Sequence, residues 1–72
     1  MRDALINSHA VIGINCIINT KSLIEHDALV SDHCHVSTGA IVNGEAKIGK
    51  SCFIGSRAVL IQSVNVQDAY FI

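Results

Sequence analysis

An aliphatic side chain recurs at every sixth position of this chain, from residue 6 to residue 72. The members are Ile6, Ile12, Ile18, Ile24, Val30, Val36, Val42, Ile48, Ile54, Leu60, Val66 and Ile72. Two residues before each of them lies a second column, which consists mainly of Ala, Cys and Ser. A period of six fits neither the 3.6-residue turn of a helix nor one long strand. It is typical of a chain that forms a short strand, turns a corner and repeats, so we predict an all-β, hexapeptide-repeat solenoid.

Three strands per turn would give a turn of eighteen residues, so residues 1–72 should form a single domain of about four triangular coils. The cysteines support this turn length, because Cys16, Cys34 and Cys52 are eighteen residues apart. They are expected to stack inside one wall, about 4.8 Å from coil to coil. We interpret them as small, buried, reduced thiols rather than as a metal or redox site, because Ala and Ser occupy the equivalent positions.

The middle outward position of each strand gives three stacked sets of side chains, one for each wall. Face A is entirely aliphatic, face B becomes polar along the column, and face C contains a histidine and two phenylalanines. The sets are Leu5, Leu23, Ile41 and Val59 for face A; Val11, Leu29, Lys47 and Asn65 for face B; Ile17, His35, Phe53 and Phe71 for face C. An unbroken aliphatic stripe is unfavourable in water. We therefore predict that face A is a subunit interface, most simply in a homotrimer about a three-fold axis.

The composition argues against several classes of partner. The net charge is −1, there is no basic cluster and aromatic residues make up 4% of the chain, which disfavours nucleic-acid and anionic-membrane partners. No purely apolar run exceeds four residues, far short of a membrane span. The first ten residues, MRDALINSHA, lack the apolar segment of a signal peptide, so a cytoplasmic protein is expected.

Gly or Asn follows the inward aliphatic residue at six of the corners. These residues are Asn7, Gly13, Asn19, Asn43, Gly49 and Gly55. Because Gly and Asn tolerate a positive φ best, we expect the left-handed turn conformation in this slot. The chain stops on the inward-facing Ile72, in what reads as an unfinished coil. This is expected of a fragment of a longer protein, or of an end that a partner covers.

His26 lies in a corner between two carboxylates, in the segment Glu25-His26-Asp27. A neighbouring carboxylate supports the basicity of an imidazole and can fix its tautomer, as a general base requires. The simpler interpretation is a solvated turn histidine, which is also our interpretation of His9 and His33 in the most exposed corner slot. Gly44, eighteen residues after His26, should stack over it. A glycine there leaves room for a ligand and a backbone N–H that could stabilise an oxyanion.

His35 occupies an outward position of face C, beside Phe53 of the next coil. It is either packed at a subunit contact or presented to a ligand in a cleft. His26 is at the corner between faces A and B, and a wall of the prism spans about 15 Å, so the two histidines cannot share a small site within one chain. A joint site would need a neighbouring subunit. The segment His33-Cys34-His35 is not expected to bind metal, because Cys34 points inward and the spacing matches no standard zinc pattern.

The stretch IINTKSLIEHDALVSDHCHVSTGAIVNGEAKIGKSCFIGSRAVL resembles the acetyl-CoA-dependent sugar acetyltransferases of the hexapeptide-repeat superfamily. The most similar branch contains the sialic-acid O-acetyltransferases and the UDP-4-amino-sugar N-acetyltransferases. The EHD and HVS segments, whose histidines are nine residues apart, carry the resemblance, which covers about residues 10 to 61. The resemblance implies a left-handed parallel β-helix that forms trimers, with active sites between subunits.

By the same resemblance, His26 corresponds to the proton acceptor and Asp27 to the acidic neighbour that supports its basicity. His35 and Gly44 correspond to residues that contact acetyl-CoA, and Asn19 to a polar residue near the site. The implied reaction transfers the acetyl group directly to an amine or hydroxyl of a sugar or nucleotide sugar. It needs neither an acyl-enzyme intermediate nor a metal.

The chain also departs from this family. It lacks the N-terminal nucleotide-sugar-binding domain and the later coils that help to hold coenzyme A. The alternative is therefore a non-catalytic, truncated solenoid that serves as a structural or assembly module. A zinc-dependent carbonic anhydrase on the same solenoid is disfavoured, because those enzymes use a histidine pair five residues apart and this chain has none.

Overall fold

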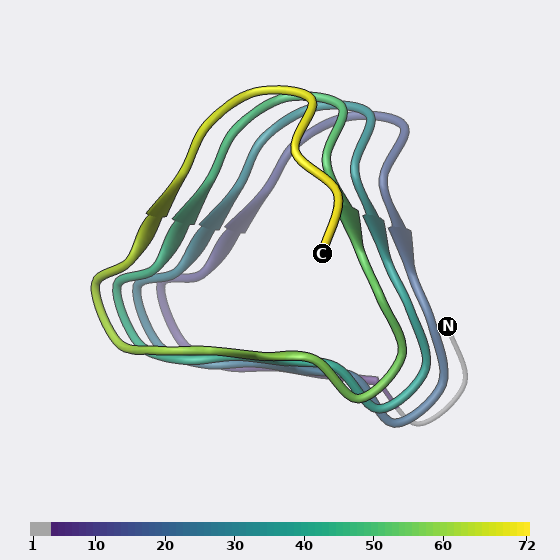
Figure 1. Cartoon of the computed structure of the whole chain (residues 1–72). Helices are drawn as coiled ribbons and strands as arrows, with labels where there is room; N and C mark the ends of the chain where they lie inside the picture. Colours follow the sequence, from purple (N-terminus) through teal and green to yellow (C-terminus); the bar gives the residue numbers. More distant parts are fainter. Residues whose placement is uncertain (1–3) are drawn as a thin grey trace.

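The computed structural model of the protein describes residues 4–72. These residues form eleven two-residue strands, arranged as the three walls of a triangular column (Figure 1). The strands are β1 (Leu5–Ile6), β2 (Val11–Ile12), β3 (Ile17–Ile18), β4 (Leu23–Ile24), β5 (Leu29–Val30), β6 (His35–Val36), β7 (Ile41–Val42), β8 (Lys47–Ile48), β9 (Phe53–Ile54), β10 (Val59–Leu60) and β11 (Asn65–Val66). The described part of the chain has no helix that is long and apolar enough to cross a membrane.

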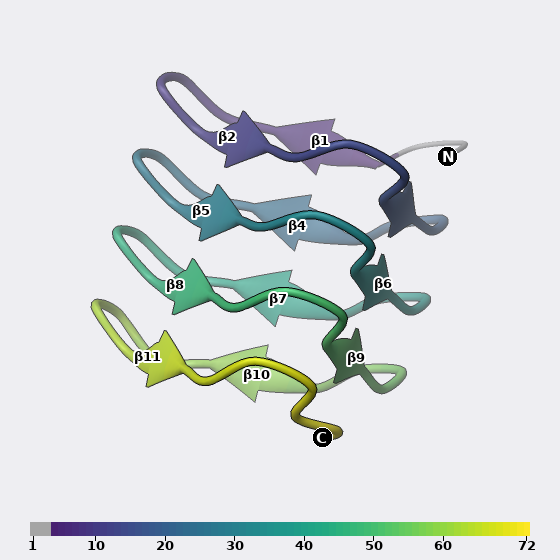
Figure 2. The same ribbon diagram turned by 90° about the horizontal axis from the view of Figure 1, so that it is seen from above.

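Each wall is a parallel sheet built from strands of successive coils (Figure 2). The order is β1-β4-β7-β10 in sheet A, β2-β5-β8-β11 in sheet B, and β3-β6-β9 in sheet C, which a bridge between Phe53 and Phe71 extends. Leu5 lies opposite Leu23, and Leu23 opposite Ile41, so one turn takes eighteen residues. The predicted all-β parallel β-helix is confirmed. The four coils of the prediction are three complete turns and a partial fourth.

The β-helix is left-handed, because the chain runs clockwise as it approaches the viewer in Figure 1. This hand is opposite to that of nearly all parallel crossover connections. The corners that join consecutive strands are four residues long, for example residues 7–10 between β1 and β2. Such corners are too short to return a strand parallel to its predecessor, so a strand pairs only with the coils above and below.

The interior of the column is filled by the two columns that the sequence predicts. The most deeply buried aliphatic residues are Ile18, Ile24, Val30, Val36, Val42, Ile48 and Ile54. They pack against buried small residues, which are Ala28, Cys34, Ala40, Ala46 and Cys52. Towards the two ends the inward side chains become exposed, to 40% at Ile6 and 46% at Ile72. Each coil therefore depends on its neighbours for burial, as is typical of a solenoid.

The three cysteines are free and lie one above another before the strands of sheet C. Each thiol donates a hydrogen bond to a backbone carbonyl in the corner of the next coil. The acceptors are Ser31 for Cys16 (3.0 Å), Gly49 for Cys34 (3.0 Å) and Gln67 for Cys52 (3.1 Å). Ser22 makes the same contact with the carbonyl of Ser37, at 2.8 Å. These Cys and Ser side chains thus donate hydrogen bonds to corner carbonyls that find no partner in the sheets.

Burial raises the pKa of the Cys34 thiol above its ordinary value of 9.0. The unfolded chain therefore ionises this thiol at lower pH than the folded chain does. We expect this thiol to stabilise the fold fully below pH 9.0, and the free energy of unfolding to fall as the pH rises above 9.0. Urea denaturation on both sides of this pH measures the effect. Cys34→Ser should show a weaker decrease, because a hydroxyl does not ionise there; equal decreases would contradict the assignment.

The left-handed backbone conformation occurs in the third residue of each corner, so our prediction for the Gly and Asn slot was wrong. The residues with positive φ are His9, Asn15, Lys21, Asp27, His33, Gly39, Glu45, Ser51, Arg57, Ser63 and Ala69. A glycine stands at one of these positions, Gly39, with φ 72°. The coils above and below hold the corner geometry, which overrides the preference of the residue that occupies it.

The glycines of the predicted slot serve close approach between coils instead. A Cβ on Gly13 would lie 2.8 Å from the backbone nitrogen of Asp32 and would collide with its carboxylate. That carboxylate accepts a hydrogen bond from the N–H of Ile14, at 2.9 Å. The same arrangement recurs two coils later in Gly49, Lys50 and Asp68.

Candidate functional site

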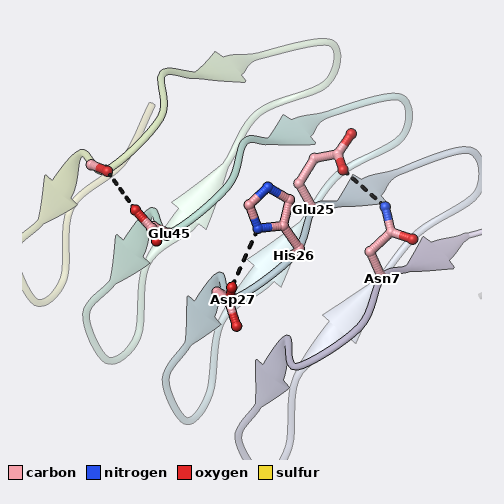
Figure 3. A network of polar contacts seen from close by, with 6 residues as sticks. Asn7, Glu25, His26, Asp27 and Glu45 are labelled. Carbon is pink, nitrogen blue, oxygen red and sulfur yellow. Dashed lines mark hydrogen bonds and ion pairs between the residues drawn. The ribbon is translucent and has the colours of Figure 1, made fainter.

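His26 belongs to a column of polar corner residues that joins sheets A and B (Figure 3). We call this column the A–B corner; it comprises residues 7–9, 25–27, 43–45 and 61–63. Its side chains are linked from coil to coil. Asn7 Nδ2 donates to Glu25 Oε1 at 2.8 Å, and Ser63 Oγ donates to Glu45 Oε1 at 3.3 Å. The eighteen-residue turn therefore gathers two imidazoles, those of His9 and His26, and three carboxylates at one corner of the column.

The imidazole of His26 is held by the carboxylate of the next residue. His26 Nδ1 lies 3.3 Å from Asp27 Oδ2, and the two side chains are 57% and 50% exposed. An ionised carboxylate can only accept a hydrogen bond, so Nδ1 is the donor of this pair. In the neutral ring Nε2 then carries the lone pair. The contact selects the tautomer that a general base needs.

Gly44 lies directly beneath this ring, as the eighteen-residue spacing predicts. A Cβ on Gly44 would lie 3.0 Å from both Cε1 and Nε2 of His26. The space that the sequence analysis left for a ligand is therefore occupied by the imidazole itself. The corner backbone is also joined here, because the N–H of Glu45 donates to the carbonyl of His26 at 3.1 Å. The absence of a side chain at Gly44 thus provides the space in which the imidazole of His26 packs.

A methyl group on Gly44 is expected to displace the His26 ring, because the contact of 3.0 Å is tighter than ordinary van der Waals distance. In Gly44→Ala, the ring resonances of His26 should therefore shift in a ¹H–¹⁵N spectrum tuned to histidine side chains. Gly39→Ala is the control: its Cβ would meet only Arg57 Cγ, at 3.5 Å, although its positive φ makes it strained. Unchanged His26 resonances in Gly44→Ala would contradict the packing of the His26 ring against Gly44.

An open groove of about 350 Å³ lies beside the imidazole. Its lining residues are Glu25, His26, Asn43, Gly44, Ile61 and Gln62. Two of them, His26 and Gly44, were predicted from the sequence as site residues, whereas Glu25, Asn43, Ile61 and Gln62 were not predicted as groove residues. The same spacing could have identified them, because residues 25, 43 and 61, and residues 26, 44 and 62, are each eighteen apart.

Two further predicted site residues, Asn19 and His35, meet at the other end of the strands of sheet A, where these strands begin. Asn19 Nδ2 lies 2.9 Å from His35 Nε2, so this ring nitrogen accepts when Nδ1 carries the proton. The His35 ring packs edge to face against Phe53, with 5.0 Å between the ring centroids. Phe53 in turn packs against Phe71 at 6.0 Å. His35 is thereby held in one orientation between an amide and an aromatic ring.

The five predicted site residues therefore form two separate clusters. His26, Asp27 and Gly44 lie at the A–B corner, after strands β4 and β7 of sheet A. Asn19 precedes β4, and His35 lies in sheet C. Sheet A stands between the clusters, so one chain does not bring them together, as the sequence geometry predicts.

The remaining histidines, His9 and His33, are exposed, each with the positive φ of the third corner residue. Within residues 4–72, no group of three or more His, Cys, Asp or Glu side chains is arranged to hold a metal ion. Comparison with protein-family models, with curated proteins and with solved structures finds no match to this chain. The features of this chain that bear on function are therefore the geometry of the two clusters and the sequence resemblance.

Proposed function

We propose that the protein is an acetyltransferase that moves the acetyl group of acetyl-CoA to an amine or hydroxyl of a sugar or nucleotide sugar. The observation that carries the proposal is the imidazole of His26, which Asp27 holds through Nδ1 at 3.3 Å beside the groove. A histidine in this tautomer presents the lone pair of Nε2 as a base. The sequence resemblance supplies the class of reaction.

In the proposed reaction, His26 Nε2 removes a proton from the acceptor as the acceptor attacks the thioester carbonyl. The carbon–sulfur bond then breaks, and the imidazolium returns the proton to the leaving thiolate. Asp27 stabilises the imidazolium in between. The N–H of Gly44 donates to no acceptor within the described residues, which leaves it available for the tetrahedral oxyanion. The transfer is direct and forms no covalent acyl-enzyme.

Asn19 and His35 are proposed to contact acetyl-CoA from a neighbouring copy. The support is their position, because both lie across sheet A from His26 and cannot reach its groove within the same chain. We propose a homotrimer in which face A packs about the three-fold axis. In the single chain the end residues of face A are exposed, to 56% at Leu5 and 58% at Val59, and Leu23 and Ile41 between them are half-buried. An apolar stripe left partly in water favours a covered state in solution.

The charges beside face A are complementary. The A–B corner carries Glu25, Asp27 and Glu45 and no Lys or Arg. The corner between sheets C and A, made of residues 19–21, 37–39 and 55–57, carries Lys21 and Arg57 and no Asp or Glu. In a cyclic arrangement the basic edge of one copy would face the acidic edge of the next. This pairing would also bring a neighbour's Asn19 towards the His26 groove.

Thiol release from acetyl-CoA, measured with a panel of amino sugars and neutral sugars, tests the proposed function. Release that depends on an acceptor supports the acetyltransferase. Calorimetry with acetyl-CoA provides a second measurement, because a non-catalytic solenoid would neither bind the coenzyme nor release its thiol. That pair of negative results would contradict the proposal.

A further inference from the structure

The carboxylate of Glu25 lies at the wall of the His26 groove with a hydrogen bond to only one of its two oxygens. Its Oε1 accepts the hydrogen bond from Asn7 Nδ2 at 2.8 Å, which fixes the side chain. Within residues 4–72, Oε2 makes no hydrogen bond and no ion pair. Figure 3 shows Glu25 on one side of the imidazole and Asp27 on the other. A fixed, incompletely paired anion therefore borders the base.

Within the groove, the side chains around this carboxylate are negative or neutral, whereas Lys47 lines the neighbouring hollow together with Asp27 and Glu45. The other side chains of the groove are uncharged at Asn43, Ile61 and Gln62, apart from the imidazole itself. Asp27 lies beside the ring, and Glu45 occupies the next coil of the A–B corner. With no Lys or Arg in that corner, the potential in the groove favours a cation over a neutral group.

We propose that Glu25 selects an acceptor that carries a protonated amine, so that nitrogen rather than oxygen is acetylated. The inference rests on the proposed acetyl transfer and deepens it. One oxygen of Glu25 would hold the ammonium while Nε2 of His26 faces the same nitrogen. A neutral hydroxyl can donate a charge-assisted hydrogen bond to this anion, but an ammonium adds to that bond the attraction between two opposite charges.

Acetyl transfer to a protonated amine releases one net proton. The ammonium first releases one proton to water, and the neutral amine attacks the thioester carbonyl, forming the carbon–nitrogen bond. The carbon–sulfur bond breaks, and His26 takes the second proton from nitrogen and delivers it to sulfur. An amine acceptor that binds as an ammonium therefore releases one proton for each acetyl group transferred. A hydroxyl acceptor releases none, because its proton ends on the thiol.

The test compares a methyl glycoside that carries one amine with the same glycoside that carries a hydroxyl in its place. Thiol release and proton release are followed together in weak buffer. We expect turnover with the amine, one proton per thiol, and little turnover with the hydroxyl compound. Glu25→Gln keeps an acceptor for Asn7 but loses the charge, so KM for the amine should rise about tenfold with little change in kcat.

Glu45→Gln is the matched control, because it removes the same charge from the same corner, but from outside the groove. It should change KM by less than about twofold. Calorimetry of the amine with both variants gives a readout that does not need turnover. Equal affinity of wild type and Glu25→Gln for the amine, or faster acetylation of the hydroxyl compound than of the amine, would overturn the inference. The second result would leave the proposed acetyl transfer intact, whereas an absence of thiol release together with an absence of coenzyme binding would contradict that transfer itself.

Discussion

His26→Ala is expected to lower kcat for acetyl transfer by about 10²- to 10⁴-fold, the usual contribution of a positioned general base. The variant removes the one imidazole that lines the groove and leaves Asp27 without its partner at 3.3 Å. The fold should persist, because the side chain is more than half exposed and belongs to no part of the core. Thiol release at saturating acceptor measures the loss, and circular dichroism checks the fold.

Two variants make this loss specific. His9→Ala removes an exposed imidazole from the same corner, one coil earlier and outside the groove, so its turnover should match that of wild type. Asp27→Asn keeps the size of the side chain but no longer requires Nδ1 to donate, so part of the rings should adopt the unproductive tautomer. We expect an intermediate loss for this variant. Full turnover in His26→Ala would exclude the histidine as the base.

The fold could be predicted from the sequence because its determinants are periodic. The aliphatic residue at every sixth position fixes which side chain of each strand points inward, and the cysteines fix three strands per turn. Together they place Gly44 under His26 and Phe53 beside His35 without any knowledge of side-chain rotamers. The coil register follows from the same count, as the pairing of Leu5 with Leu23 shows.

Side-chain geometry could not be predicted in the same way. The position of the left-handed residue was missed because residues such as His9 and Lys21 adopt it despite their preferences. The filling of the space over Gly44 depends on the rotamer of His26, which no spacing specifies. The contact of Asn19 with His35 joins residues sixteen apart, a separation that belongs to neither period. Such contacts arise where a corner residue reaches across to the strand of the next coil.

Neither the hand of the β-helix nor the assembly of copies follows from the six-residue period. The left hand of the column was expected from the resemblance alone, since a period of six is compatible with either hand. Assembly stays a proposal, but the separation of the two clusters by sheet A gives it a physical consequence. If the site needs both clusters, any change that separates the copies must remove activity even where the His26 corner is intact.

Ile41→Asp is therefore expected to convert the proposed trimer into monomers and to abolish acetyl transfer. Ile41 is the half-buried centre of face A, in β7, with Leu23 and Val59 on the coils above and below. A carboxylate buried there without a partner costs several kcal/mol at each of the three copies. Because its side chain points out of the column, the substitution should leave the core and the circular dichroism spectrum unchanged. Light scattering coupled to size-exclusion chromatography measures the mass.

Leu29→Asp is the matched control, because it places the same charge at the equivalent outward position of sheet B. It should remain assembled and active. Equal dissociation of the two variants would show that the charge, and not face A, separates the copies. Asn19→Ala is expected to be impaired, because it loses its proposed contact with acetyl-CoA. Mixing it with His26→Ala gives a sharper result, since a site shared between subunits must regain some activity in mixed trimers. Ile41→Asp introduced into either partner should prevent that recovery, because it removes the contact that puts a His26 from one chain beside the Asn19 of another.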